Sequence, residues 1–195
     1  MTEGMDSAWF EMNLSEEPGC TTTSEIRDYC LTNKMGNEKR TAGDSISPHV
    51  TILHCGPVKS DSVDRLLRVA RFTNLDRLAT LGGATQWESF FHPTKEDESY
   101  IVRTFPNADA NLYLVILKML YDNLVTIGFT PPNNPYTESR KLHISMFHHT
   151  SIANLIDHRE HLPDQPCDKW NIQFSKPVLA YKNRATGKIT RHQIY

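Results

Sequence analysis

Two short segments of the chain share one pattern: a histidine, an apolar residue, a hydroxyl residue and another apolar residue. They are PHVTI at 48–52 and LHISM at 142–146, and both lie in runs rich in β-forming residues. Alternate side chains of a β-strand point to opposite faces. His49 and Thr51 therefore share one face of the first strand, and His143 and Ser145 share one face of the second. The apolar residues beside them face the other way, into a core.

The elements around these two segments follow in the same order. Each expected strand is followed by a helix and then by two more β-rich runs. After the strand at 48–53 come a helix from Ser60 or Asp61 to about Ala70 and strands at 85–91 and 100–105; after the strand at 141–147 come a helix at 152–161 and strands at 170–175 and 178–183. A loose duplication of this kind predicts an α+β fold in which two similar lobes face one another.

Further elements complete the expected fold. We expect a strand at 8–14, a helix at 25–34 and a final short strand at 188–195. Between the two repeated units, Asp109 is expected to open the longest helix, which ends near Gly128 and is apolar around most of its circumference. No break in composition divides the chain, so residues 1–195 are expected to form a single domain.

The two histidine strands suit the cleavage of a phosphodiester. An imidazole has a pKa of about 6.5 in water, so it can act as an acid or a base near neutral pH. Two of them on opposite sides of a phosphate can divide the roles, one taking a proton from the attacking hydroxyl or water and the other giving one to the leaving oxygen. The hydroxyls of Thr51 and Ser145 can donate to the non-bridging phosphate oxygens, where charge develops. This arrangement requires no metal.

PHVTIL (48–53) and LHISMF (142–147), with the order of elements around them, resemble the 2H phosphoesterase superfamily, which has the LigT-like or cyclic phosphodiesterase fold. The resemblance implies a bilobal α+β protein, with two pseudo-symmetric lobes of antiparallel sheet around a central groove and helices outside. It implies that His49, Thr51, His143 and Ser145 are the catalytic residues and that there is no metal or other cofactor. The second motif has serine where the family more often has threonine, a change that the family pattern allows.

Residues that hold the rest of the substrate are harder to select. Phe10 and Trp87 are our choices for stacking on a base, because aromatic side chains bind bases in this way, although most aromatics in such runs belong to a core. Arg103 and Lys141 are our choices for additional phosphate contacts, although a solvated surface position would explain either of them equally simply.

Composition and the remaining motifs argue against several other classes. The net charge of −2 and pI near 6.5 are unlike those of a duplex DNA or RNA binder. The four cysteines lack zinc-site spacing, and His158 and His161 lack the glutamate of a zinc-protease helix, so we expect no metal and free thiols. The sequence shows neither a signal peptide nor an apolar run long enough for a membrane span. We therefore expect a monomer in the cytoplasm, which is the host cytoplasm if the protein is viral.

The resemblance leaves the substrate open. The family acts on nucleotide phosphodiesters with a 2′ feature, and a small protein made of this one domain suggests a signalling nucleotide, such as a 2′-5′ oligoadenylate or a cyclic dinucleotide like cGAMP. Viral members use such activity in immune evasion. One alternative is processing of 2′,3′-cyclic nucleotides or RNA ends. A non-enzymatic alternative is a module that binds RNA or a nucleotide in an inactive groove, although a pure binder has no need of two imidazoles.

Overall fold

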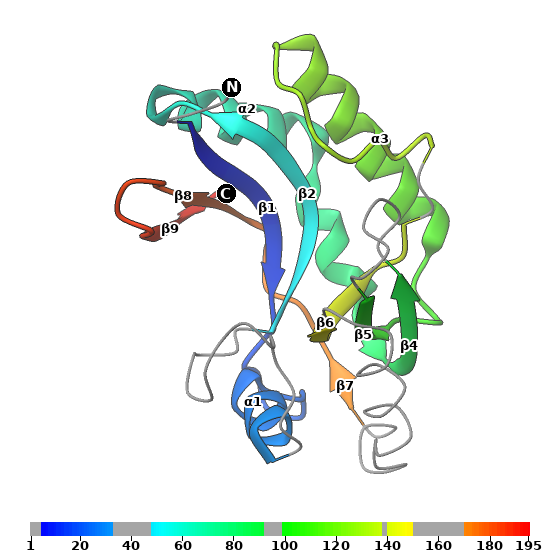
Figure 1. The fold of residues 1–195 in the computed structure, drawn as a ribbon. Coiled ribbons are helices and arrows are strands. Elements are labelled where there is room, and N and C mark those ends of the chain that lie inside the picture. Colours follow the sequence, from blue (N-terminus) through cyan, green and yellow to red (C-terminus); the bar gives the residue numbers. More distant parts are fainter. Residues whose placement is uncertain (1–4, 33–47, 92–98, 138–139, 150–169) are drawn as a thin grey trace.

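Each of the two histidine strands belongs to a different antiparallel sheet. A computed structural model describes residues 5–32, 48–91, 99–137, 140–149 and 170–195 (Figure 1). The larger sheet has the order β2-β1-β8-β9, with β1 at Asp6–Asn13, β2 at His49–Val58, β8 at Val178–Lys182 and β9 at Ile189–Gln193. A second sheet has the order β4-β5-β6, with β4 at Gln86–Phe91, β5 at Ser99–Thr104 and β6 at His143–His149. A short pair joins β3 (Gly83–Ala84) to β7 (Asn171–Ile172).

The helices lie outside these sheets (Figure 1). They are α1 at Thr23–Thr32, α2 at Val63–Thr73 and α3 at Ala110–Thr126, with 3₁₀ turns at Ser60–Ser62 and Leu75–Leu81. As predicted, Asp109 caps α3, its side chain accepting a hydrogen bond from the backbone N–H of Leu112 at 2.9 Å. The 3₁₀ turn at Leu75–Leu81 has no counterpart in the sequence-based expectations, and the helix expected at 152–161 lies outside the described residues.

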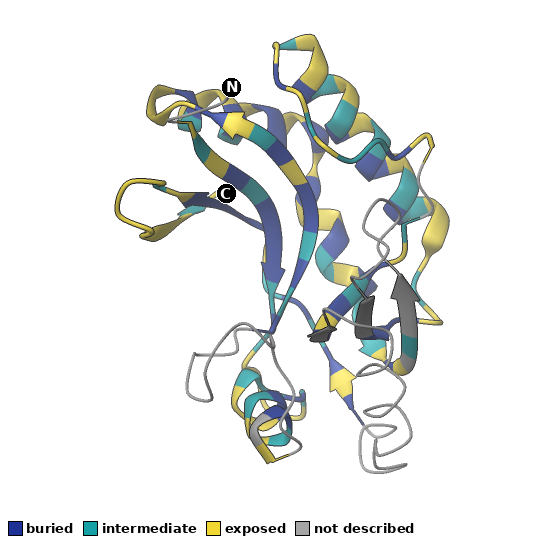
Figure 2. Cartoon of the chain, in the orientation of Figure 1, coloured by how far each residue is buried: buried dark blue, intermediate teal, exposed yellow. Residues whose placement is uncertain are grey.

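The core lies between the larger sheet and the helices that cover it. Along β1, Ala8, Phe10 and Met12 are buried and belong to this core, as do Leu66 of α2 and Leu117 of α3. Figure 2 shows buried residues along β1 and β2 and on the sides of α2 and α3. Each large apolar side chain that is fully buried contributes about 1.5–3 kcal/mol. The opposite face of the larger sheet is thereby left for polar residues.

The two lobes predicted from the sequence are present, but the chain exchanges strands between them. The strands that follow the His49 strand, β4 and β5, pair with β6, which carries His143. The β8 and β9 strands, which come after the His143 strand, return to the sheet of β1 and β2. The order of elements along the chain therefore does not show which strands pair, since each sheet takes strands from both repeated units. This exchange ties both lobes together through their sheets.

Strand β2 is longer than the strand expected at 48–53, since it continues through Gly56 and Pro57 to Val58. Gly56 has a φ of +85°, and a Cβ at this position would overlap the carbonyl oxygen of Thr130. A glycine is needed where the backbone has a positive φ and another backbone approaches closely. The register of β1 and β2 shifts between Ala8 and Trp9, so Gly56 sits at an irregularity within the strand rather than at a turn.

Candidate active site

The strands that carry the two histidines lie next to each other, although they belong to different sheets. His49 is the first residue of β2 and His143 is the first residue of β6. Figure 1 shows β6 beside the lower part of β2. The two rings are close enough that a positive charge on His49 lowers the pKa of His143. The structure thus brings together the two imidazoles that the sequence places far apart.

A hydrogen bond to the backbone fixes the ring of His143. Its Nδ1 lies 2.8 Å from the carbonyl oxygen of Lys141, which can only accept, so Nδ1 carries the proton and donates. In the neutral ring, Nε2 then holds the lone pair. Burial is the largest influence on the pKa of His143 and lowers it, and the charge of Arg140 lowers it further. At neutral pH the ring is therefore uncharged and able to accept a proton at Nε2.

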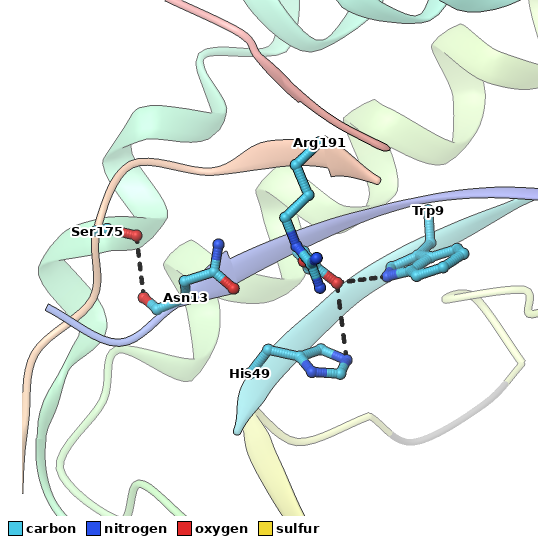
Figure 3. Close-up of polar contacts among 6 residues, drawn as sticks. Trp9, Asn13, His49, Ser175 and Arg191 are labelled. Carbon is cyan, nitrogen blue, oxygen red and sulfur yellow. Dashed lines mark hydrogen bonds and ion pairs between the residues drawn. The ribbon is translucent and has the colours of Figure 1, made fainter. Parts of the chain in front are cut away.

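His49 faces a buried carboxylate. Its Nε2 lies 3.8 Å from Oε2 of Glu11, whose side chain is fully buried, whereas the His49 side chain is 32% exposed. Glu11 also accepts hydrogen bonds at 2.6 Å from Nε1 of Trp9 and at 2.6 Å from Nε of Arg191 (Figure 3). Asn13 pairs with His49 across the two strands. Residues from β1, β2 and β9 thus meet around the first histidine.

A shift in strand register brings another histidine to the same face. Glu11 pairs with Thr51 but Phe10 pairs with Leu53, so Ile52 is an extra residue in β2. Beyond this bulge, His54 lies opposite Trp9, and the two ring centroids are 5.9 Å apart. The surrounding protein lowers the pKa of His54 by keeping water from its charged form, and Arg140 and His49 lower it further. Strict alternation along the strand would have placed His54 on the core side.

Arg140 is the cation of this site that sequence reasoning missed. It directly precedes Lys141, and its charge lowers the pKa of both His54 and His143. Its Nη1 atom is buried and has no hydrogen-bond partner among the described residues. A buried guanidinium N–H without an acceptor is costly, which makes it a natural donor to an anion. The basic pair Arg140-Lys141 before the second motif was the available signal, and the expectation named only Lys141.

Two of the residues chosen for substrate contacts prove to be structural. Phe10 is fully buried in the core, so no base can stack on it. Arg103 is also fully buried and donates to the hydroxyl of Thr85 at 2.7–2.9 Å and to its carbonyl at 2.9 Å. Both expectations are wrong, because each side chain points to the interior of its lobe.

The other expected residues lie nearer the histidines. Lys141 is exposed and forms an ion pair with Glu88, and its carbonyl oxygen, rather than its ammonium group, contacts His143. Thr51 is half-buried and Ser145 is exposed, so both hydroxyls are available to a ligand. The backbone of Trp87 belongs to β4, but its side chain lies outside what the structure describes, and its role stays a prediction.

The described ranges contain neither a grouped set of metal ligands nor a helix suited to crossing a membrane. There, no three His, Cys, Asp or Glu side chains are grouped in a way that could hold a metal ion. Across the same residues, none of the helices combines the length and apolar character that a membrane crossing requires.

Comparison with solved structures places this architecture among the phosphoesterases. Escherichia coli LigT complexed with 3′-AMP matches with a TM-score of 0.54 and 15% sequence identity, over 96% of this chain and 94% of that one. Usb1 from Kluyveromyces marxianus matches with a TM-score of 0.50 and 12% identity, over 96% and 98% of the two chains. A further crystal structure of a phosphoesterase matches with a TM-score of 0.50 and 12% identity, over 96% and 94%. Neither a protein-family model nor a curated protein sequence matches the chain.

These likenesses extend over nearly the whole chain and define its class of fold. The structures matched are members of the 2H phosphoesterase superfamily. The chain therefore has the α+β, LigT-like fold of the 2H phosphoesterases, as the two histidine motifs indicated.

Proposed function

We propose that the protein is a metal-independent phosphodiesterase that cleaves a nucleotide phosphodiester with a 2′ feature. The observation that carries this proposal is the meeting of His49 and His143, from two sheets, close enough for their charges to interact. Each ring comes from a strand that also carries a hydroxyl, Thr51 or Ser145. The fold shared with LigT and Usb1 supports the same class of reaction.

The hydrogen bond of His143 suggests how the two histidines divide their work. Because its neutral ring has the lone pair on Nε2, His143 is the general base, which takes a proton from the attacking hydroxyl or water. His49 is the general acid, which gives a proton to the leaving oxygen as the phosphorus–oxygen bond breaks. With His143 as the base, this role falls to the ring of the other motif, whose Nε2 lies 3.8 Å from Oε2 of Glu11.

The remaining groups of the site would hold the phosphate. The hydroxyls of Thr51 and Ser145 donate to non-bridging oxygens, and the guanidinium of Arg140 supplies a positive charge beside them. Such donors stabilise the transition state because negative charge accumulates on these oxygens. The solved LigT complex contains 3′-AMP and a solved Usb1 complex contains uridine monophosphate, which makes nucleoside monophosphates suitable probes of this site.

Within this class we propose a small signalling nucleotide as the substrate, either a 2′-5′ oligoadenylate or a cyclic dinucleotide such as cGAMP. The net charge of −2 favours a small ligand over a long nucleic acid, because long chains are bound through many cationic side chains.

A panel of substrates tests both the proposed class of enzyme and the proposed substrate. The protein is incubated in EDTA with 2′-5′ oligoadenylate, a 2′,3′-cyclic nucleotide, and 2′,3′- and 3′,3′-cyclic dinucleotides, and products are separated by chromatography. Hydrolysis of a signalling nucleotide in EDTA is the expected result. Turnover of the 2′,3′-cyclic nucleotide alone would contradict the substrate but keep the enzyme class. Binding of nucleotides without any turnover would contradict the enzyme.

A further inference from the structure

We propose that Glu11 is a positioning residue for His49, and that Arg191 and Trp9 hold Glu11 in place. The inference rests on the proposed function for its catalytic readout, but its structural part can be tested without any substrate. It gives a role to Arg191 of β9, a strand that carries neither histidine motif.

Glu11 is an unusual residue for the middle of a β-strand. Its side chain has no exposed surface, and a buried carboxylate is costly unless charged and hydrogen-bonding groups surround it. Oε1 accepts from Nε of Arg191, and Oε2 accepts from Nε1 of Trp9 while facing Nε2 of His49 (Figure 3). Two donors thus aim the carboxylate at the imidazole. The carboxylate is thereby shared between two fixed donors and the ring of His49.

The register of the larger sheet explains how Arg191 reaches Glu11. Trp9 pairs with Ala180, and Ala180 pairs with Arg191, so the three residues form one row across β1, β8 and β9. Residues paired directly across strands share a face. The small side chain of Ala180 lets the long side chain of Arg191 extend over β8 to the carboxylate on β1. A larger residue at position 180 would stand in this path.

The charged groups around His49 come from several elements. Most of them are cationic, so their net effect on the His49 ring depends on the carboxylate of Glu11. Arg191 of β9 and Arg140, just before β6, carry positive charge, and His54 of β2 and His143 of β6 become cationic when protonated. Glu11 is the anion facing the ring, and it also neutralises Arg191. Removing the carboxylate would leave the protonated ring among cations, whereas removing Arg191 would leave it facing an unneutralised carboxylate.

These two changes should therefore alter the surroundings of the His49 ring in opposite ways. Glu11→Gln keeps the size of the side chain and removes its charge; Arg191→Met removes the cation, whose side chain is 39% exposed, and keeps the carboxylate. By nuclear magnetic resonance of the imidazoles, we expect the ring resonances of His49 to shift in both variants. Asp6→Asn is the matched control, because Asp6 is a carboxylate of the same strand that accepts from Tyr181 and Arg184.

The outcomes separate this inference from the proposed function. If the His49 resonances in Glu11→Gln and Arg191→Met are the same as in Asp6→Asn and in the unaltered protein, Glu11 does not act on His49. The activity readout is a fall in kcat of about 10- to 100-fold in Glu11→Gln with little change in KM, as for other groups that orient a reacting residue. A protein that hydrolysed nothing would overturn the proposed function, while the resonances of His49 would still decide the role of Glu11. If Glu11→Gln does not fold, the shift of these resonances in Arg191→Met decides it.

Discussion

Nδ1 of His143 donates to the carbonyl oxygen of Lys141, two residues earlier in the chain, at 2.8 Å. This contact is made within the start of β6, so it is set by local backbone geometry and not by the distant lobe. It turns Nε2 of the neutral ring into an acceptor. The backbone carbonyl of Lys141 thereby orients the His143 ring, while the Lys141 side chain pairs with Glu88.

Replacing Arg140 should weaken the binding of a nucleotide. Arg140→Gln removes the guanidinium whose Nη1 atom is buried and whose charge acts on His54 and His143. A hydrogen bond from a charged donor contributes about 1.5–3 kcal/mol, so the Kd for a nucleoside monophosphate should rise about tenfold or more, as measured by calorimetry. Arg68→Gln is the control, because Arg68 donates to the carbonyl of Asp64 in its own helix. Equal Kd values for Arg140→Gln and the unaltered protein would remove Arg140 from the phosphate site.

Removing the motif hydroxyls should slow turnover without moving its pH optimum. Thr51→Val and Ser145→Ala each delete a donor that stabilises phosphate charge but transfers no proton. Loss of one such donor costs on the order of 3 kcal/mol in comparable sites, which is a fall in kcat of roughly a hundredfold. The measurement is a full pH profile of kcat/KM for each variant. A shift of either limb by about one unit or more would mean that the hydroxyl tunes an imidazole instead.

The free energy of unfolding should decrease as the pH falls from 7.5 to 5.5. The pKa of His143 is lowered in the folded protein, first by burial and then by neighbouring charges that include Arg140, and the pKa of His54, an exposed residue, is lowered as well. Below about 6.5 the unfolded chain therefore binds more protons than the folded one, and stability is lost. The lowered pKa values of Asp6 and Glu25 act only at more acidic pH, since a carboxyl group is ionised throughout this window.

Thermal unfolding at pH 7.5 and at pH 5.5 tests whether stability decreases as the pH falls. His54→Gln and His143→Gln should each show a smaller fall in Tm between pH 7.5 and 5.5 than the unaltered protein. A pH-independent Tm in the unaltered protein, or an unchanged fall in both variants, would show that these rings are not held uncharged by the fold.

The histidine motifs could be predicted because their signal is local. Two-residue alternation places His49 with Thr51 and His143 with Ser145, and no distant contact alters that. The same rule, applied to β1, would also have corrected one error. Glu11 and Asn13 are polar and share a face with Trp9, which leaves Phe10 on the core side with Met12. Trp9, rather than Phe10, is the β1 aromatic residue that contacts Glu11 and His54.

Other parts of the site depend on contacts that a sequence does not display. The bulge at Ile52, which turns His54 toward Trp9, depends on how β2 pairs with β1. The hydrogen bond between Glu11 and Arg191 joins β1 to β9. These strands are separated in the sheet by β8, so the bond depends on how both of them pair with β8. The exchange of strands between the lobes likewise follows from pairing, since either assignment satisfies the pattern of each strand alone.

The central claim is that His49 and His143 cleave one phosphodiester together, and its most direct test is the turnover of two single variants. His49→Ala and His143→Ala are assayed in EDTA on the substrate that the panel identifies, with folding checked by circular dichroism. Each should remain folded and lose about 10²–10⁴-fold in kcat, the usual contribution of a positioned acid or base. If either folded variant retained near-normal turnover, the two histidines would not act as a catalytic pair.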